Sequence, residues 1–305
     1  MLRGGPPKAI GQVLPGTSSC ASSEAPAGPA ARPSDNPRYQ QLKQSGPQYR
    51  RSRQSRDLAR QKVLRRLDVA GDRINSRTPY PDEIAYITTF LINATLPLKE
   101  PPPGTRLWTR RFQDKRGIIA VTFEAGAEQN EDGTERHFGL PYGIYPRVLL
   151  SWFISEALTT KNRVLTLVDP DPFAPNHVAR SFSAWMRDSL GVIPKGGEKG
   201  SITLLREQMT RLFNLKISVT INGKESRFRL LPIKGDQGFF DPSVEHGERA
   251  TKPLRIIIDD DFFVKILRSS SPSHLGVQKE LAALGACLAL DLYRFISLKQ
   301  FALQK

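Results

Sequence analysis

The sequence contains very little cysteine or histidine. Of 305 residues, two are Cys and four are His. Cys20 and Cys287 lie far apart and show no Cys-x-x-Cys spacing, which argues against a disulfide framework and a structural zinc site. The four histidines are scattered, with no His-x-His pair of the kind that a metal-dependent DNA-nicking site uses. This composition fits a protein of the reducing cytoplasm.

Long apolar runs are also missing. No apolar stretch follows Arg3 and Lys8 at the N-terminus. The most apolar late stretch, residues 281–298, carries Asp291 and Arg294 in its middle. We therefore expect neither a signal peptide nor a membrane span, and no membrane partner.

Two short patterns resemble catalytic or ligand sites but lack an essential feature. Gly191 and Gly196 have the spacing of a phosphate-binding loop, but Gly197 follows where that loop requires Lys. Asp259-Asp260-Asp261 offers carboxylates for Mg²⁺, yet it follows an Ile-rich strand, and neighbouring carboxylates on a strand point to opposite faces. A strand that runs into a solvated turn explains the triplet better. We expect no enzymatic activity and no cofactor.

Acidic residues are the scarce charged type. Lys and Arg number 45 against 30 Asp and Glu, which gives a net charge of +15 and a pI near 10.0. Clustered cations that neutralise phosphates release counterions from nucleic acid, so this imbalance favours a nucleic-acid partner. Charge kept for solubility, or an anionic membrane surface, is the alternative.

The N-terminal residues 1–78 predict a disordered tail in two parts. Residues 1–37 are rich in Pro, Gly, Ala and Ser. Residues 38–77 hold twelve Lys and Arg against three Asp, and their Leu and Val residues suit a short basic helix that orders on DNA. A purely solvated tail is the equal alternative. The expected auxiliary phosphate contacts are Arg50, Arg51, Arg53 and Arg56.

Residues 79–268 predict one α+β domain. A Pro81-Asp82-Glu83 start with apolar residues at helical spacing predicts a helix over residues 81–94. A β-rich run follows at 117–123, then a core helix at 145–158, a short strand at 163–168 and a helix at 181–190.

Residues 201–214 predict an amphipathic helix with Ser201 as its N-cap. One stripe is apolar, and the opposite stripe is polar, with Gln208 beside it. In a DNA major groove, Arg reads guanine and Gln reads adenine. Behind this helix, two alternating segments flank Asn222-Gly223 and predict a basic hairpin.

Helix, strand, helix, turn, helix and basic hairpin follow one another as in a winged helix, whose third helix enters a groove while its wing touches the backbone. The predicted DNA-binding residues of the helix and hairpin are Lys199, Ser201, Thr203, Arg206, Gln208, Thr210, Arg211, Lys224, Arg227 and Arg229.

Four stretches of the chain resemble plasmid-encoded RepA replication initiators: residues 87–94, 139–163, 181–191 and 200–213. The resemblance covers roughly residues 87–299. It implies winged-helix domains that bind repeated double-stranded DNA sites at a plasmid origin, recruit host replication proteins and often repress their own gene.

Two segments depart from that pattern. Such initiators usually have two winged-helix domains, whereas residues 269–305 resemble only the opening helix of an incomplete second domain, as in a truncated product. Residues 170–175 resemble an inserted surface loop.

Other functions remain open at this stage. A transcriptional repressor or copy-number regulator would use the same helix and hairpin, but it would prefer an inverted repeat to tandem repeats. RNA binding is less favoured because no aromatic-rich strand is evident. The apolar helix at 145–158 could instead form a dimer interface, so a homodimer is one expected assembly.

Overall fold

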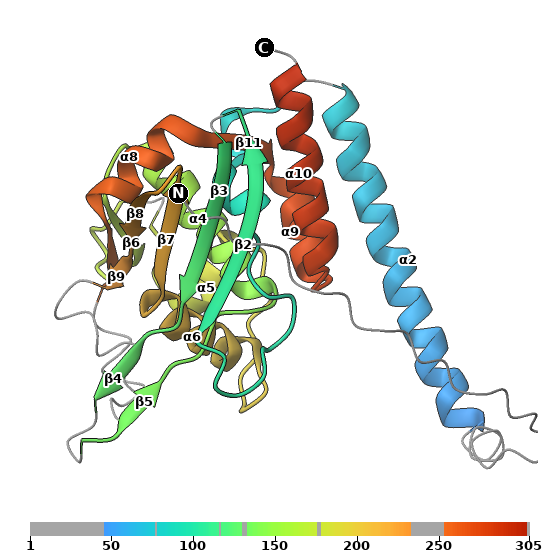
Figure 1. Cartoon of the computed structure of the whole chain (residues 1–305). Helices are drawn as coiled ribbons and strands as arrows, with labels where there is room; N and C mark the ends of the chain where they lie inside the picture. The colour runs from blue at the N-terminus through green and yellow to red at the C-terminus, as the bar shows by residue number, and fades with distance from the viewer. Residues whose placement is uncertain are drawn as a thin grey trace, which may run out of the picture. The chain divides into compact units, whose positions relative to one another are not determined.

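The long helix α2 (Gly46–Ser76) begins the part of the chain described by the computed structural model, which covers residues 46–76, 78–115, 117–129, 133–175, 178–232 and 253–303 (Figure 1). The chain divides into two units, residues 1–58 and 59–305. Residues 46–76 form one continuous helix, longer than the short basic helix that the sequence suggested, and their Arg, Leu, Gln and Ala residues favour it. The assignment of residues 1–78 to a separate tail stays a prediction. For residues 1–45 the prediction lies outside the described residues.

The largest sheet has four antiparallel strands in the order β2-β3-β7-β8. Its strands are β2 (Leu107–Asp114), β3 (Gly117–Glu124), β7 (Lys216–Ile221) and β8 (Lys224–Phe228). Side chains alternate between its two faces. Val121, Phe123 and Val219 are buried on the inner face, whereas Thr109 and Thr122 bond to each other on the outer face.

Three smaller sheets complete the β structure. The order β6-β10-β9 joins β6 (Val164–Val168), β10 (Leu254–Ile258) and β9 (Leu230–Pro232). The other two are antiparallel pairs: β4 (Ala127–Gln129) with β5 (Glu135–His137), and β1 (Ile84–Thr88) with β11 (Ser270–His274).

The predicted helix over residues 81–94 is wrong. That segment forms the 3-10 turn η2 (Pro81–Glu83), strand β1 and the short helix α3 (Thr89–Asn93). Ile84 of β1 pairs with His274 of β11, far along the chain. This non-local pairing overrides the local helical spacing of the isoleucines.

Helix α4 (Ile144–Thr160) lies at the centre of the core. It is apolar on most sides, as a helix surrounded by other elements should be, and Leu149, Phe153 and Ile154 are fully buried. Around it lie α5 (Phe182–Asp188), α6 (Ser201–Phe213) and α8 (Asp260–Ser269). None of the helices that the structure describes is long and apolar enough to cross a bilayer.

The acidic triplet at residues 259–261 begins helix α8 instead of forming a solvated turn. Asp259 is the N-cap, and its Oδ1 accepts a hydrogen bond from the backbone N–H of Asp261 at 3.0 Å. Asp260 and Asp261 lie in the first turn, where negative charge stabilises a helix.

Helices α9 (Leu275–Ala283) and α10 (Cys287–Leu303) belong to the same unit as α4. Arg147 of α4 is 3% exposed and binds Asp291 of α10, with Nε–Oδ1 at 2.9 Å and Nη2–Oδ2 at 2.8 Å. Arg294 donates to the Gln278 amide oxygen, and burial lowers the pKa of its guanidinium to about 10. These buried pairs join α10 to α4 and to α9 within one unit. The domain boundary at residue 269 stays a prediction.

The predicted element order is present, since α4, β6, α5, α6 and the hairpin β7–β8 follow one another. Strand β6 pairs with β10, and the hairpin pairs with β3. The described fold is therefore of the mixed α+β class, with the hairpin embedded in a larger sheet.

Candidate nucleic-acid interface

The start of α6 is fixed by a tight turn. Its N-cap is Gly200 and not Ser201 as predicted. Only glycine fits at this position, because a Cβ at Gly200 would lie 2.3 Å from the carbonyl oxygens of Lys195 and Gly196. Ser201 instead donates to the Ile193 carbonyl at 2.7 Å. The Ser201 hydroxyl therefore holds the turn, although Lys199 in the same turn is exposed.

Two of the residues predicted to lie on the polar side of α6 have structural partners. Gln208 is 3% exposed, and its Oε1 accepts from the Tyr142 backbone N–H at 2.9 Å. Arg211 has a side chain 15% exposed, and its Nη2 lies 2.6 Å from Glu207 and 3.0 Å from Glu100. Gln208 was expected to read a base, but it is part of the core face. The charge of Arg211 is neutralised by two carboxylates.

The rest of the polar side is only partly exposed. Thr203 is exposed and donates to the Gly197 carbonyl at 2.8 Å. Arg206 is half-buried, with its guanidinium 5.3 Å from the ring centre of Phe182. Thr210 is half-buried and donates to the Arg206 carbonyl at 3.1 Å. The surface that α6 presents is thus smaller than its sequence suggested, although Leu205, Met209, Leu212 and Phe213 are buried as expected.

The predicted hairpin is present as β7–β8. Asn222 and Gly223 have φ values of 49° and 81°, as the two central residues of a type I′ turn require. Lys224, Arg227 and Arg229 are all exposed. Arg227 bonds to Glu225 at 3.0 Å, whereas no carboxylate among the described residues forms an ion pair with Lys224 or Arg229.

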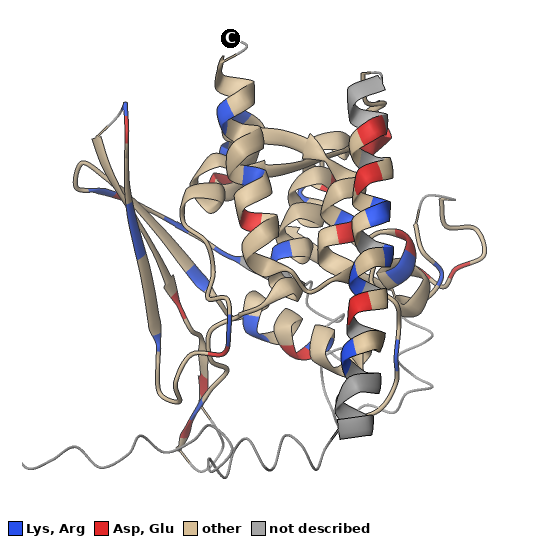
Figure 2. Cartoon of the chain, turned by 90° about the vertical axis from the view of Figure 1, so that its right-hand side faces the viewer, with Lys and Arg blue, Asp and Glu red and all other residues tan. Residues whose placement is uncertain are grey.

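A second basic hairpin was missed in the sequence. Strand β2 exposes Arg110 and Arg111, Arg106 is exposed just before it, and Lys115 is exposed at the turn into β3. The sequence signal is five Lys and Arg between residues 106 and 116. It was overlooked because the apolar residues of β2 do not alternate regularly. Figure 2 shows Lys and Arg at several points along the strands at its left.

The tips of the two basic hairpins lie side by side. β3 pairs with β7 from Ile119 opposite Ile221 to Glu124 opposite Lys216, so both turns are at the same end of the sheet. A Cβ at Gly117 would lie 2.5 Å from the Asn222 amide oxygen. Lys115 and Lys224 therefore flank a common edge of the molecule.

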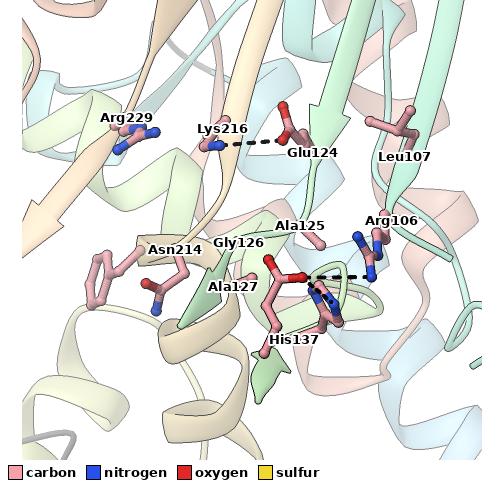
Figure 3. A pocket seen from close by; sticks show the side chains of 12 residues that line it. Arg106, Leu107, Glu124, Ala125, Gly126, Ala127, His137, Asn214, Lys216 and Arg229 are labelled. Atoms are coloured by element: carbon pink, nitrogen blue, oxygen red, sulfur yellow. Dashed lines mark hydrogen bonds and ion pairs between the residues drawn. The ribbon is translucent and has the colours of Figure 1, made fainter. Parts of the chain in front are cut away.

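A charged cleft of about 520 Å³ lies at the opposite end of this sheet (Figure 3). Arg106 and His137 approach Glu135 at 3.9 and 3.3 Å, and Lys216 pairs with Glu124 at 3.3 Å. No group of three metal-ligating side chains was found among the described residues. With most of its charges paired, this cleft offers less to a polyanion than the hairpin tips do.

The arm residues are described only in part. Arg53 is exposed on α2, whereas the side chains of Arg50, Arg51 and Arg56 lie outside the described residues.

Helix α6 and the β7–β8 hairpin follow one another directly in the chain, and their buried residues belong to the same hydrophobic core.

The family model for plasmid encoded RepA protein matches residues 140–305, more than half of the chain. The chain belongs to the plasmid-encoded RepA family. It is thus a member of a family of plasmid replication proteins. No curated protein and no solved structure matches it.

The part matched by the RepA family model contains α4, α6, the β7–β8 hairpin and the C-terminal helices. It begins after β2 and β3, so the second basic hairpin of this RepA-family chain lies outside the match. The sheet nevertheless joins both hairpins, because β3 pairs along the whole length of β7.

Proposed function

We propose that this RepA-family chain is a plasmid replication initiator that binds repeated double-stranded DNA sites at the plasmid origin. The observation that carries the proposal is the pair of basic hairpin tips, with Lys115 on one and Lys224 on the other, at one end of the large sheet. Helix α6 leads into β7 at the other end of that sheet. Both lysines are exposed, and the family match supplies the replication context. The proposal contains no catalytic step and no cofactor.

The proposed interface divides its contacts by chemistry. Exposed lysines and arginines on hairpin tips can neutralise phosphates and set the register of the protein on the duplex, but they carry no sequence information. Sequence would be read by α6 as the recognition helix of a winged-helix unit, with Thr203 and the half-buried Arg206 and Thr210 as its remaining candidates. Lys199 and Arg53 would add phosphate contacts.

The test is a footprinting and binding titration on the parent replicon at two salt concentrations. An initiator should protect tandem repeats at the origin cooperatively, and should bind host helicase or initiator proteins. Stronger binding to an inverted repeat at its own promoter would favour a repressor or copy-number regulator. Equal affinity for origin and random DNA of the same length would refute sequence-specific binding.

A further inference from the structure

A groove of about 800 Å³ lies on the side of α4 that α6 does not cover. Its floor follows one face of α4 from Val148 to Thr159, twelve residues or about 16 Å of helix. Trp152 and Leu158 are only partly buried there. The walls come from β1, the end of α5 and the start of α9.

The charge of this groove is opposite to that of the chain as a whole. Asp82, Glu156 and Asp188 line it, and Lys279 is its one basic lining residue. The Lys279 ammonium already donates to the Asp188 carbonyl at 2.7 Å. The floor is about three helical turns long and combines Val148, Trp152 and Leu158 with polar side chains of α4, Glu156 among them. Such a mixed floor, with further carboxylates at its sides, fits an amphipathic helix that carries positive charge.

Helix α2 of the same chain has a face with this chemistry. Leu58, Lys62, Arg65 and Val69 are spaced at i, i+4, i+7 and i+11, so they form one stripe about 16 Å long. All four are exposed, with Leu58 at 67% and Val69 at 53%. Two basic side chains thus lie between two apolar ones along a surface of the same length as the groove.

In residues 59–76 of α2, the opposite side is occupied within the unit 59–305. Leu67, nine residues from Leu58 and therefore half a turn away, packs against the cluster that includes Leu281 and Leu290. Arg66 forms an ion pair with Glu280 at 2.7 Å. Within the unit 59–305, the side of α2 that carries Lys62, Arg65 and Val69 is therefore opposite the side that packs on the cluster, and we assign the groove that receives it to another molecule.

We infer that the Leu58–Val69 stripe of α2 docks in the α4 groove of a second copy of this chain. The two surfaces differ, so the contact is heterologous and can repeat head to tail. Such a contact would suit copies that face the same way along tandem sites, but it does not depend on DNA binding.

The test uses charge reversal in the full chain, without DNA. The groove variant is Asp82→Lys with Asp188→Lys, and the arm variant is Lys62→Glu with Arg65→Glu. All four positions are exposed, so wild-type folding is expected and is checked by thermal unfolding. Matched controls are Glu128→Lys on β4 and Arg60→Glu on the other side of α2. Sedimentation velocity measures association at low and high salt.

The wild type and both controls should associate at low salt in a concentration-dependent way, and high salt should weaken this association. The self-association of each charge-reversed variant alone should be weaker than that of the wild type by at least about tenfold, because like charges would meet in the contact. A mixture of the two variants should regain association, because the intact arm of one variant meets the intact groove of the other, and the reversed arm and the reversed groove are again opposite in charge.

Three results would overturn the inference. The first is a wild type that stays monomeric at every concentration. The second is association that neither variant weakens. The third is a mixture of two correctly folded variants that does not regain association.

Discussion

Replacement of Lys115 and Lys224 by Ala, singly and together, tests whether the two hairpin tips contact DNA phosphates. Both side chains are exposed at turns, and neither forms an ion pair among the described residues, so the loss should leave the fold intact. Each lysine that neutralises a phosphate contributes about 0.9 to the slope of log affinity against log salt. The double variant should therefore have a slope shallower by about 1.8.

That slope change corresponds to a measurable difference in affinity. Over a fourfold rise in salt, one phosphate contact accounts for about a 3.5-fold loss of affinity, and two contacts account for about a 12-fold loss. Over the same rise in salt, the wild type should therefore lose about 12-fold more affinity for DNA than the double variant loses. The two plots should converge towards 1 M salt, where counterion release no longer favours binding.

The assay is fluorescence anisotropy with a labelled origin fragment and a labelled random fragment, at four salt concentrations. The matched control is Lys299→Ala on α10, which removes an equal charge from a helix outside the large sheet. The double variant should show the shallower slope on both fragments, because phosphate contacts are independent of sequence. Plots parallel to that of the wild type would refute the assignment of the tips.

Four further variants test the structure and the role of α6. If Arg206 contacts a base, Arg206→Ala should cost about 1 to 3 kcal/mol of binding free energy on specific DNA. An equal loss on random DNA would show that Arg206 only positions the protein on the duplex. Gln208→Ala should cost about 1 to 3 kcal/mol of folding stability and leave the ratio of specific to random binding unchanged. Asp291→Ala leaves the buried Arg147 charge unpaired and should cost about 3 to 5 kcal/mol in urea unfolding, so an unchanged midpoint would contradict the buried pair. Gly223→Val forces a β-branched residue to φ 81° and should cost about 1 to 2 kcal/mol, which thermal unfolding can check.

Local signals in the sequence were sufficient for several elements. The apolar residues around Phe153 predicted the core helix α4, and the stripe from Leu205 to Phe213 predicted α6, because each helix buries the face that its own sequence marks. Asn222-Gly223 predicted the hairpin because few other residues adopt two successive positive φ angles.

Contacts between distant residues decided the rest. Ile84 and Ile87 have helical spacing, yet pairing with β11 makes their segment a strand. Gln208 lies on α6 near the buried Leu205 and Leu212, and only the position of Tyr142 shows that the Gln208 amide bonds to the backbone there. Lys115 and Lys224, over a hundred residues apart, meet at one edge only through the pairing of β3 with β7. The sequence by itself determined the basic character of this RepA-family chain and the elements with strong local patterns. Only the tertiary structure decided which cations gather and which are neutralised, because both depend on partners that local periodicity does not encode.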